Sequence, residues 1–278
     1  MTKNLQIFFV GLASLIIGLS TGLFLQGKGT DKVVQSPYTP RQQQTPNSPS
    51  SFGLNPPNFS YDQLYQIAQS ITVKVLSGQT SGSGILIQKQ GEIYTVVTNN
   101  HVLVFGLTNQ SYRIKTEDNQ IHNAQVIKSV DFKKNDLGLL QFRSQNNYKV
   151  ATISSLAKIN YEAEVYAAGF PAEIDSSSSE FVLSTGKIKM FSDLAFGGGY
   201  QIGSTNKVQK GMSGGPLLNR QGEIIGINGV HRYPLWGNPY VFEDGSVASP
   251  EKKQLMSQYS WAIPIQTFLN IAPEFARK

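Results

Sequence analysis

Gly211-Met212-Ser213-Gly214-Gly215-Pro216 is the stretch that decides between the possible folds of this chain. Three glycines and a proline surround one hydroxyl, which forces a backbone that few side chains would tolerate. Two short β-prone runs follow at residues 216–218 and 223–227, and turn-forming residues separate them. We therefore expect Ser213 on a tight, exposed turn that leads into a β-hairpin, which is where a nucleophile can be reached.

Short β-prone runs recur along the rest of the chain. They lie at residues 71–76, 84–88, 93–98, 112–115, 137–142, 165–168 and 181–189. A short helix is expected after Ser60, which has capping-box spacing to Gln63, and residues 265–276 are the only other segment expected to be helical. This spacing, without long alternating helices, predicts an all-β sandwich or barrel.

Composition narrows the class of protein. The chain has 278 residues, of which 40% are apolar and 26 are glycine, so it can bury a sizeable core with many turns. Its formal net charge is +6, but residues 1–59 hold four basic and one acidic side chain, which leaves 20 against 17, or +3, for the rest. That charge is too mild to indicate a nucleic-acid binder. The absence of cysteine excludes disulfides, thiolate metal sites and a cysteine nucleophile.

Residues 5–25 form a stretch of 21 residues without a charged side chain, between Lys3 and Lys28. Such a stretch is long enough to cross a bilayer as a helix, and we interpret it as a transmembrane signal anchor. A cleaved signal peptide, which would give a secreted protein, is the alternative, but its apolar region would be shorter. Lys3 favours a cytoplasmic amino terminus, which predicts that everything after Lys28 lies on the extracytoplasmic side, periplasmic or extracellular.

Residues 29–58 are rich in proline, glutamine and serine. This composition buries too little apolar surface to fold, so we expect a disordered linker that holds the next domain away from the membrane. The folded domain is then expected at residues 60–278.

Catalysis by Ser213 would require a base and a group that orients the base. The three histidines are His101, His122 and His231. His101 ends the apolar run 93–102, where a strand would hold it rigidly, and Asp136 opens another apolar run, where a partly buried carboxylate could accept the imidazole N–H. His122 lies in the polar stretch 117–123 and is most simply a surface residue.

With these residues in the order His, Asp, Ser, the sequence resembles the trypsin-like serine peptidases of the chymotrypsin fold, and among them most resembles bacterial Deg/HtrA-like protease domains. The resemblance covers residues 71–276. The segments that carry it are Thr98-Asn99-Asn100-His101-Val102, Asn135-Asp136-Leu137-Gly138-Leu139-Leu140, Gly211-Met212-Ser213-Gly214-Gly215-Pro216, Ser81-Gly82-Ser83-Gly84-Ile85-Leu86-Ile87, Gly222-Glu223-Ile224-Ile225-Gly226-Ile227-Asn228 and Trp261-Ala262-Ile263-Pro264.

The resemblance implies two antiparallel Greek-key β-barrels, at about residues 71–150 and about residues 160–263. His101 and Asp136 would come from the first barrel and Ser213 from the second. By the logic of the triad, Ser213 attacks the scissile carbonyl, His101 moves the proton, and Asp136 orients and stabilises the imidazolium. The backbone N–H groups of Gly211 and Ser213 would form the oxyanion hole. The chain would thus be a membrane-tethered serine endopeptidase acting on proteins or peptides.

Substrate-binding positions are also implied by the resemblance, at Lys207, Asn228, Gly229 and His231. Lys207 precedes Ser213 by six residues and would line the base of the primary specificity pocket, where a lysine opposes a basic P1 side chain. We therefore expect cleavage after small apolar or acidic residues. His231 would shape this pocket, or would simply be a wall or surface residue.

Two features depart from the family pattern. Met212 stands where family zymogens carry an aspartate, so activation by pairing with a freed amino terminus is not expected. The sequence ends at Lys278, and we expect no PDZ module of the kind that many Deg/HtrA-like enzymes carry.

The sequence leaves two rival functions. Residues 211–215 also satisfy the G-x-S-x-G pattern of α/β-hydrolases, but that fold needs a helix after the serine and the order Ser, acid, His. The second rival is a catalytically silent, protease-fold module that binds peptides or proteins; intact His101, Asp136 and Ser213 argue against it. No spacing typical of metal ligands and no nucleotide-binding glycine loop is present, so no metal or cofactor is expected.

Overall fold

The computed structural model describes residues 58–104, 111–154, 160–172, 181–232 and 239–275. The predicted anchor at residues 5–25, and the predicted linker except Asn58, lie outside the described residues. Within the described ranges, no helix is long and apolar enough to cross a membrane.

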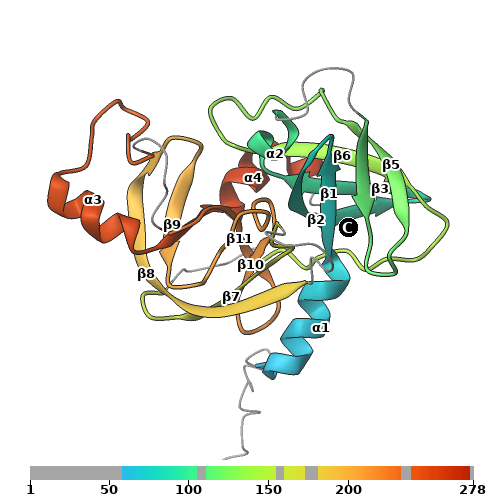
Figure 1. The fold of residues 1–278 in the computed structure, drawn as a ribbon, viewed down its shortest axis with the longest axis horizontal. Helices are drawn as coiled ribbons and strands as arrows, with labels where there is room; N and C mark the ends of the chain where they lie inside the picture. The colour runs from blue at the N-terminus through green and yellow to red at the C-terminus, as the bar shows by residue number, and fades with distance from the viewer. Residues whose placement is uncertain (1–57, 105–110, 155–159, 173–180, 233–238, 276–278) are drawn as a thin grey trace, which may run out of the picture. The chain divides into compact units, whose positions relative to one another are not determined.

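Within the described residues, twelve strands form two closed antiparallel barrels, β1–β6 and β7–β12. The labelled strands of the first barrel lie on the right of Figure 1, and those of the second lie toward the left. The first contains β1 (Thr72–Ser77), β2 (Thr80–Gln90), β3 (Ile93–Thr98), β4 (Tyr112–Lys115), β5 (Ile121–Val126) and β6 (Gly138–Arg143). The second contains β7 (Glu164–Gly169), β8 (Val182–Phe196), β9 (Tyr200–Ser204), β10 (Pro216–Leu218), β11 (Ile224–Val230) and β12 (Ser260–Pro264). The strands follow the same order around both barrels: β1-β2-β3-β6-β5-β4 in the first and β7-β8-β9-β12-β11-β10 in the second. The prediction of an all-β protein with two barrels is confirmed.

Several strands are apolar on both faces because each face meets a different core. Successive side chains of a strand point to opposite sides. Leu86, Val96 and Leu140 therefore fill the first barrel, whereas their neighbours Ile85, Val97 and Leu139 join a cluster shared with the second barrel.

The second barrel follows the same rule. Its interior contains Ala167, Leu217 and Ile225, and the neighbours Ala168, Leu218 and Ile224 belong to the shared cluster. Burying an aliphatic side chain of this size stabilises a fold by about 1.5–3 kcal/mol. The apolar cluster between the barrels therefore holds them together, and with them the loops that carry the candidate site.

Helix α1 (Tyr61–Ile71) precedes β1 and begins as the sequence predicts. Ser60 accepts a hydrogen bond from the Gln63 backbone N–H at 3.3 Å, and the Gln63 side chain accepts one from the Ser60 N–H at 2.9 Å. The buried residues Leu64, Ala68 and Ile71 attach the helix to the shared cluster.

The expectation of only one further helix was wrong. The structure has α2 (Asn100–Val104), α3 (Pro250–Ser257) and α4 (Ile265–Ile271), followed by the 3₁₀ turn η1 (Pro273–Phe275). Ser249 caps α3 and accepts a hydrogen bond from the Lys252 N–H at 3.3 Å, with Pro250 in the first turn, which is a start signal present in the sequence. Pro273 explains why α4 ends before the predicted residue 276, which itself lies outside the described part.

The α/β-hydrolase alternative is contradicted by the element after Ser213. Residues Pro216–Leu218 form strand β10, which pairs with β11 in a hairpin, instead of a helix.

Candidate active site

His101 lies in the short helix α2, one turn after strand β3 ends at Thr98. The sequence interpretation that His101 closes the strand was therefore wrong by three residues. The three apolar residues Val102-Leu103-Val104 do not by themselves distinguish a strand from a single helical turn. The turn is fixed because Val102 and Leu103 are buried in the first barrel's core, which leaves the His101 side chain 38% exposed.

Asp136 faces His101 with both carboxylate oxygens. Its Oδ1 accepts the backbone N–H of His101 at 2.8 Å, and its Oδ2 lies 2.5 Å from His101 Nδ1. A third donor, the Tyr200 hydroxyl, reaches Oδ2 at 2.6 Å. Asn99 holds the same segment by donating from Nδ2 to the Asp136 carbonyl at 2.8 Å. The pair is thus fixed both in backbone and in side chain.

The electrostatics of Asp136 favour a carboxylate. Burial by itself raises the carboxyl pKa, because a charge is less well solvated inside a protein. The hydrogen bonds from His101 and Tyr200, together with the nearby imidazole, more than offset burial, so the pKa of Asp136 is lowered from 3.8. Asp136 is thus a carboxylate at neutral pH and its oxygens accept hydrogen bonds from the imidazole.

The loop 211–214 of the second barrel carries Ser213 in a backbone that only glycine permits at two positions. Gly211 has φ +94°, and a Cβ there would lie 2.3 Å from the Ala172 nitrogen. Gly214 has φ +86°, and its Cβ would lie 2.2 Å from the Ser83 carbonyl oxygen. The glycines noted in the sequence are therefore explained by close approach to neighbouring backbone.

Ser83, from strand β2, attaches this loop to the first barrel. Its N–H donates to the Ser213 carbonyl at 2.8 Å, and its hydroxyl donates to the Gly211 carbonyl at 2.8 Å. The same hydroxyl accepts the Phe170 N–H at 2.9 Å. This role of Ser83 could not be predicted from the motif that contains it, because the three partners lie far away along the chain.

Two backbone N–H groups of this loop have no acceptor among the described residues. Within the described residues, neither the Gly211 N–H nor the Ser213 N–H donates a hydrogen bond. The neighbouring carbonyls are engaged, since Lys210 accepts from the Ala172 N–H at 2.7 Å and Met212 accepts from the Gly215 N–H at 3.1 Å. Two free N–H groups flanking a serine can stabilise a developing oxyanion.

The hydroxyl of Ser213 donates to the Gly229 carbonyl at 3.2 Å. No hydrogen bond joins it to His101 in the described structure. Gly229 lies where the β11–β12 register shifts between Asn228 and Val230, so a bulge presents this carbonyl to the serine. A rotation about the Cα–Cβ bond of Ser213 is thus needed before its hydroxyl could meet an imidazole.

The remaining candidate residues lie in different settings. Lys207 is exposed, and its backbone N–H donates to the Ser184 hydroxyl at 2.7 Å. Asn228 is 2% exposed, and its side chain donates to the Pro216 carbonyl at 2.7 Å, so it is used inside the barrel. His231 is half-buried, with Nδ1 at 2.9 Å from the carbonyl of Arg232.

His122 is not the simple surface residue that was expected. It lies in β5 and is half-buried, with Nε2 at 3.0 Å from the Tyr148 hydroxyl and its ring on Phe142 at a centroid distance of 4.8 Å. These contacts place it in the wall of the first barrel, away from His101.

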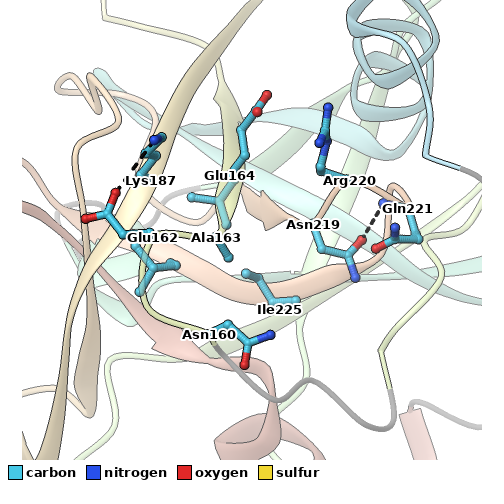
Figure 2. A pocket seen from close by; sticks show the side chains of 11 residues that line it. Asn160, Glu162, Ala163, Glu164, Lys187, Asn219, Arg220, Gln221 and Ile225 are labelled. Atoms are coloured by element: carbon cyan, nitrogen blue, oxygen red, sulfur yellow. Dashed lines mark hydrogen bonds and ion pairs between the residues drawn. The ribbon is translucent and has the colours of Figure 1, made fainter.

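A separate cavity of about 470 Å³ lies in the second barrel, between the start of β7 and the β10–β11 turn. Figure 2 shows Glu162 and Lys187 pointing toward each other on one side of it and Arg220 on the other. None of the candidate site residues lines it, so it is distinct from the site built around His101. Among the described residues, no group of three or more acidic, histidine or cysteine side chains could hold a metal ion.

Known proteins match both the sequence and the fold. Residues 82–227 match the family model described as a trypsin-like peptidase domain. The chain is 27% identical over 232 residues to the serine protease HTRA1 of Xenopus tropicalis, covering 73% of this chain and 44% of that protein. It is 30% identical over 154 residues to the serine protease Do-like HtrA of Bacillus subtilis (strain 168), covering 54% of this chain and 33% of that protein.

The chain spans less than half the length of these curated relatives. A crystal structure of the serine endoprotease from Yersinia pestis superposes with a TM-score of 0.56 at 21% identity, covering 79% of this chain and 68% of that one. At that identity the superposition supports the fold alone.

Proposed function

The chain belongs to the trypsin-like peptidase family, and from this premise we propose that it is a serine endopeptidase that hydrolyses peptide bonds in protein substrates. The observation that carries the proposal is the bidentate contact of Asp136 with His101. The carboxylate accepts both the backbone N–H at 2.8 Å and, at 2.5 Å, Nδ1 of the same residue. This fixes the imidazole and leaves Nε2 available as a base.

In the proposed mechanism, Ser213 rotates from the Gly229 carbonyl toward His101 and attacks the scissile carbonyl carbon. His101 takes the hydroxyl proton at Nε2 and then gives it to the leaving amine, while Asp136 stabilises the imidazolium. The free N–H groups of Gly211 and Ser213 stabilise the oxyanion, which is worth about 10²- to 10³-fold in turnover per donor. Water then hydrolyses the acyl-enzyme by the same proton transfers in reverse. The residues named require no cofactor for these steps.

The test is labelling of the purified full-length chain with a fluorophosphonate probe, with casein turnover measured in parallel. We expect labelling and turnover that vanish in Ser213→Ala and after denaturation. A matched serine variant away from the site, Ser70→Ala, should label like the wild type; Ser70 Oγ donates to the Ile67 carbonyl within α1. Absence of both signals in folded protein would favour the peptide-binding module.

We further propose that residues 5–25 anchor the enzyme in a membrane and that residues 60–278 act on the extracytoplasmic side. Support comes from the 21 uncharged residues and from Lys3 before them. Reporter tags placed after Lys28 test the orientation. Tags found in the cytoplasm would contradict it, and release of the chain without residues 5–25 would favour a cleaved signal peptide.

A further inference from the structure

The acid of the candidate triad is held by both barrels. Asp136 lies at the entry to β6 of the first barrel, whereas Tyr200 is the first residue of β9 in the second barrel. The Tyr200 hydroxyl donates to Asp136 Oδ2 at 2.6 Å. This oxygen is the same one that faces His101 Nδ1 at 2.5 Å. Any change at the tyrosine hydroxyl therefore acts directly on the atom that orients the imidazole.

The position of the Tyr200 ring is fixed by its packing. Tyr200 is 3% exposed, and its ring stacks on Phe196 at a centroid distance of 5.7 Å and an angle of 25°. A Cβ at Gly198 would lie 2.8 Å from ring atom Cε2, and one at Gly229 would lie 1.9 Å from the hydroxyl oxygen. Both glycines thus give the ring a space that no other residue would leave.

The segment around Tyr200 also contacts the backbone of the acid. The Asp136 N–H donates to the Gly198 carbonyl at 2.9 Å, and Asn135 forms an isolated bridge with Gly198. Gly229 packs closely against the Tyr200 hydroxyl. The carbonyl of the same glycine accepts the hydrogen bond from Ser213 Oγ. Tyr200 therefore stands between the acid of the first barrel and the serine of the second.

We propose that Tyr200 is a positioning residue for the peptidase reaction, which holds Asp136 Oδ2 against His101 and ties the acid to the barrel that carries Ser213. The inference rests on the proposed function. No atom of Tyr200 is assigned to the substrate or to proton transfer.

Tyr200 is suited to this role because it stays a donor. Burial, and then the neighbouring negative charge of Asp136 and their hydrogen bond, raise the pKa of the Tyr200 phenol well above 10.0. The hydroxyl thus keeps its proton at neutral and mildly alkaline pH. Without this donor, Asp136 Oδ2 keeps only the imidazole as partner, and the carboxylate is then held by His101 alone. Its negative charge, no longer shared with the phenol, then also acts more fully on the imidazole and favours the imidazolium.

The test compares Tyr200→Phe with the matched control Tyr94→Phe. Tyr94 is also a fully buried tyrosine whose hydroxyl donates a hydrogen bond, to the Asn146 carbonyl at 2.8 Å, but it lies in the first barrel away from the site. We expect Tyr200→Phe to lower kcat on a peptide substrate about tenfold, as loss of a hydrogen bond to a charged group implies, with little change in KM. The acid limb of its kcat/KM profile should move to higher pH. Tyr94→Phe should change neither, although it destabilises the fold.

A folded Tyr200→Phe variant with wild-type kcat and an unshifted profile would overturn the inference while leaving the proposed function intact. If Tyr200→Phe does not fold, Gly198→Ala reaches the same bond, because its Cβ would lie 2.8 Å from ring atom Cε2 and displace the ring that carries the hydroxyl. The same loss of kcat and the same shift are then expected.

Failure of the proposed function is read separately, by fluorophosphonate labelling of the wild type. Should the wild type not label, urea unfolding of Tyr200→Phe, Asp136→Asn and the double variant still tests the contact. Non-additive shifts in the unfolding midpoint support the link between the two side chains, and additive shifts overturn it.

Discussion

The backbone N–H of Ser83 donates to the carbonyl oxygen of Ser213 at 2.8 Å, which joins strand β2 of the first barrel directly to the candidate nucleophile loop of the second. The Ser83 hydroxyl adds a bond to the Gly211 carbonyl at 2.8 Å. The loop that would bind the oxyanion is thus positioned by the opposite barrel. The shape of the site depends on how the barrels pack, and not only on the glycines of the loop.

Ser83→Ala should loosen this loop while keeping the backbone bond to Ser213. We expect the free energy of unfolding to fall by about 1–3 kcal/mol, since the Gly211 carbonyl and the Phe170 N–H lose a buried partner, and kcat to fall about tenfold. Ser70→Ala is the control, because Ser70 is 7% exposed and donates one hydrogen bond within α1. Urea unfolding and peptide turnover measure both effects. Equal kcat in the two variants would show that Ser83 serves stability alone.

Gly211→Ala should remove catalysis more completely. The new Cβ would lie 2.3 Å from the Ala172 nitrogen, a backbone atom, so the Gly211 peptide must rotate and its N–H no longer faces the oxyanion. Loss of one such donor lowers kcat by about 10²- to 10³-fold.

Gly91→Ala controls for backbone strain in the measurement of kcat for the Gly211 variant. Gly91 has φ +59°, but a Cβ there meets nothing within 4 Å. It should cost about 1 kcal/mol of stability without altering kcat. Turnover by Gly211→Ala at the level of Gly91→Ala would argue against an oxyanion role for this loop.

Acid unfolding should depend on Asp136. Its pKa is lowered in the folded state from 3.8, so its charged form stabilises the fold above pH 3.8, and this stabilisation is lost as the pH falls through the lower, folded-state value. The urea midpoint of Asp136→Asn should therefore fall less steeply than that of the wild type below pH 3.8.

Asp244→Asn serves as the surface control for this acid unfolding. Hydrogen bonds with Ser246 also lower the pKa of Asp244, but the carboxyl is fully exposed. Its effect on the acid dependence should be small because solvent screens exposed charges. Parallel wild-type and Asp136→Asn curves would show that the His101 and Tyr200 contacts do not stabilise the carboxylate.

The parts of the fold that the sequence predicted well are those with two buried faces. Strand β3 (Ile93–Thr98) reads as a continuous apolar run because alternate residues enter two cores. Strand β5 (Ile121–Val126) was missed because Ala124 is its one buried residue, so its composition resembles a polar loop. It is a strand because β4 and β6 pair with it on either side.

The candidate site also contains residues that a local sequence pattern predicts and contacts that no local pattern predicts. His101, Asp136 and Ser213 are predicted from their local motifs, since each is flanked by residues that favour a turn or a strand. The contact of Tyr200 with Asp136 joins residues 64 positions apart, and nothing around Tyr200 in the sequence indicates a partner. Contacts that depend on the packing of one barrel against another require the structure.

Lys207 is expected to influence which P1 side chain the enzyme accepts. Lys207 is exposed, six residues before Ser213, and its ammonium would repel a basic P1 side chain if the substrate enters on this side. In a peptide library we expect the wild type to cleave after small apolar or acidic residues. We expect Lys207→Glu to lower the ratio of kcat/KM for acidic P1 substrates to kcat/KM for small apolar P1 substrates. The expected decrease is about two- to fivefold, which is the size of effect that an exposed charge pair gives. Lys128→Glu, at an exposed position just after β5, makes the same change in net charge at another surface and should leave the ratio unchanged. Cleavage confined to arginine in the wild type would exclude any such role for Lys207, because its positive charge would then lie too far from the P1 side chain to act.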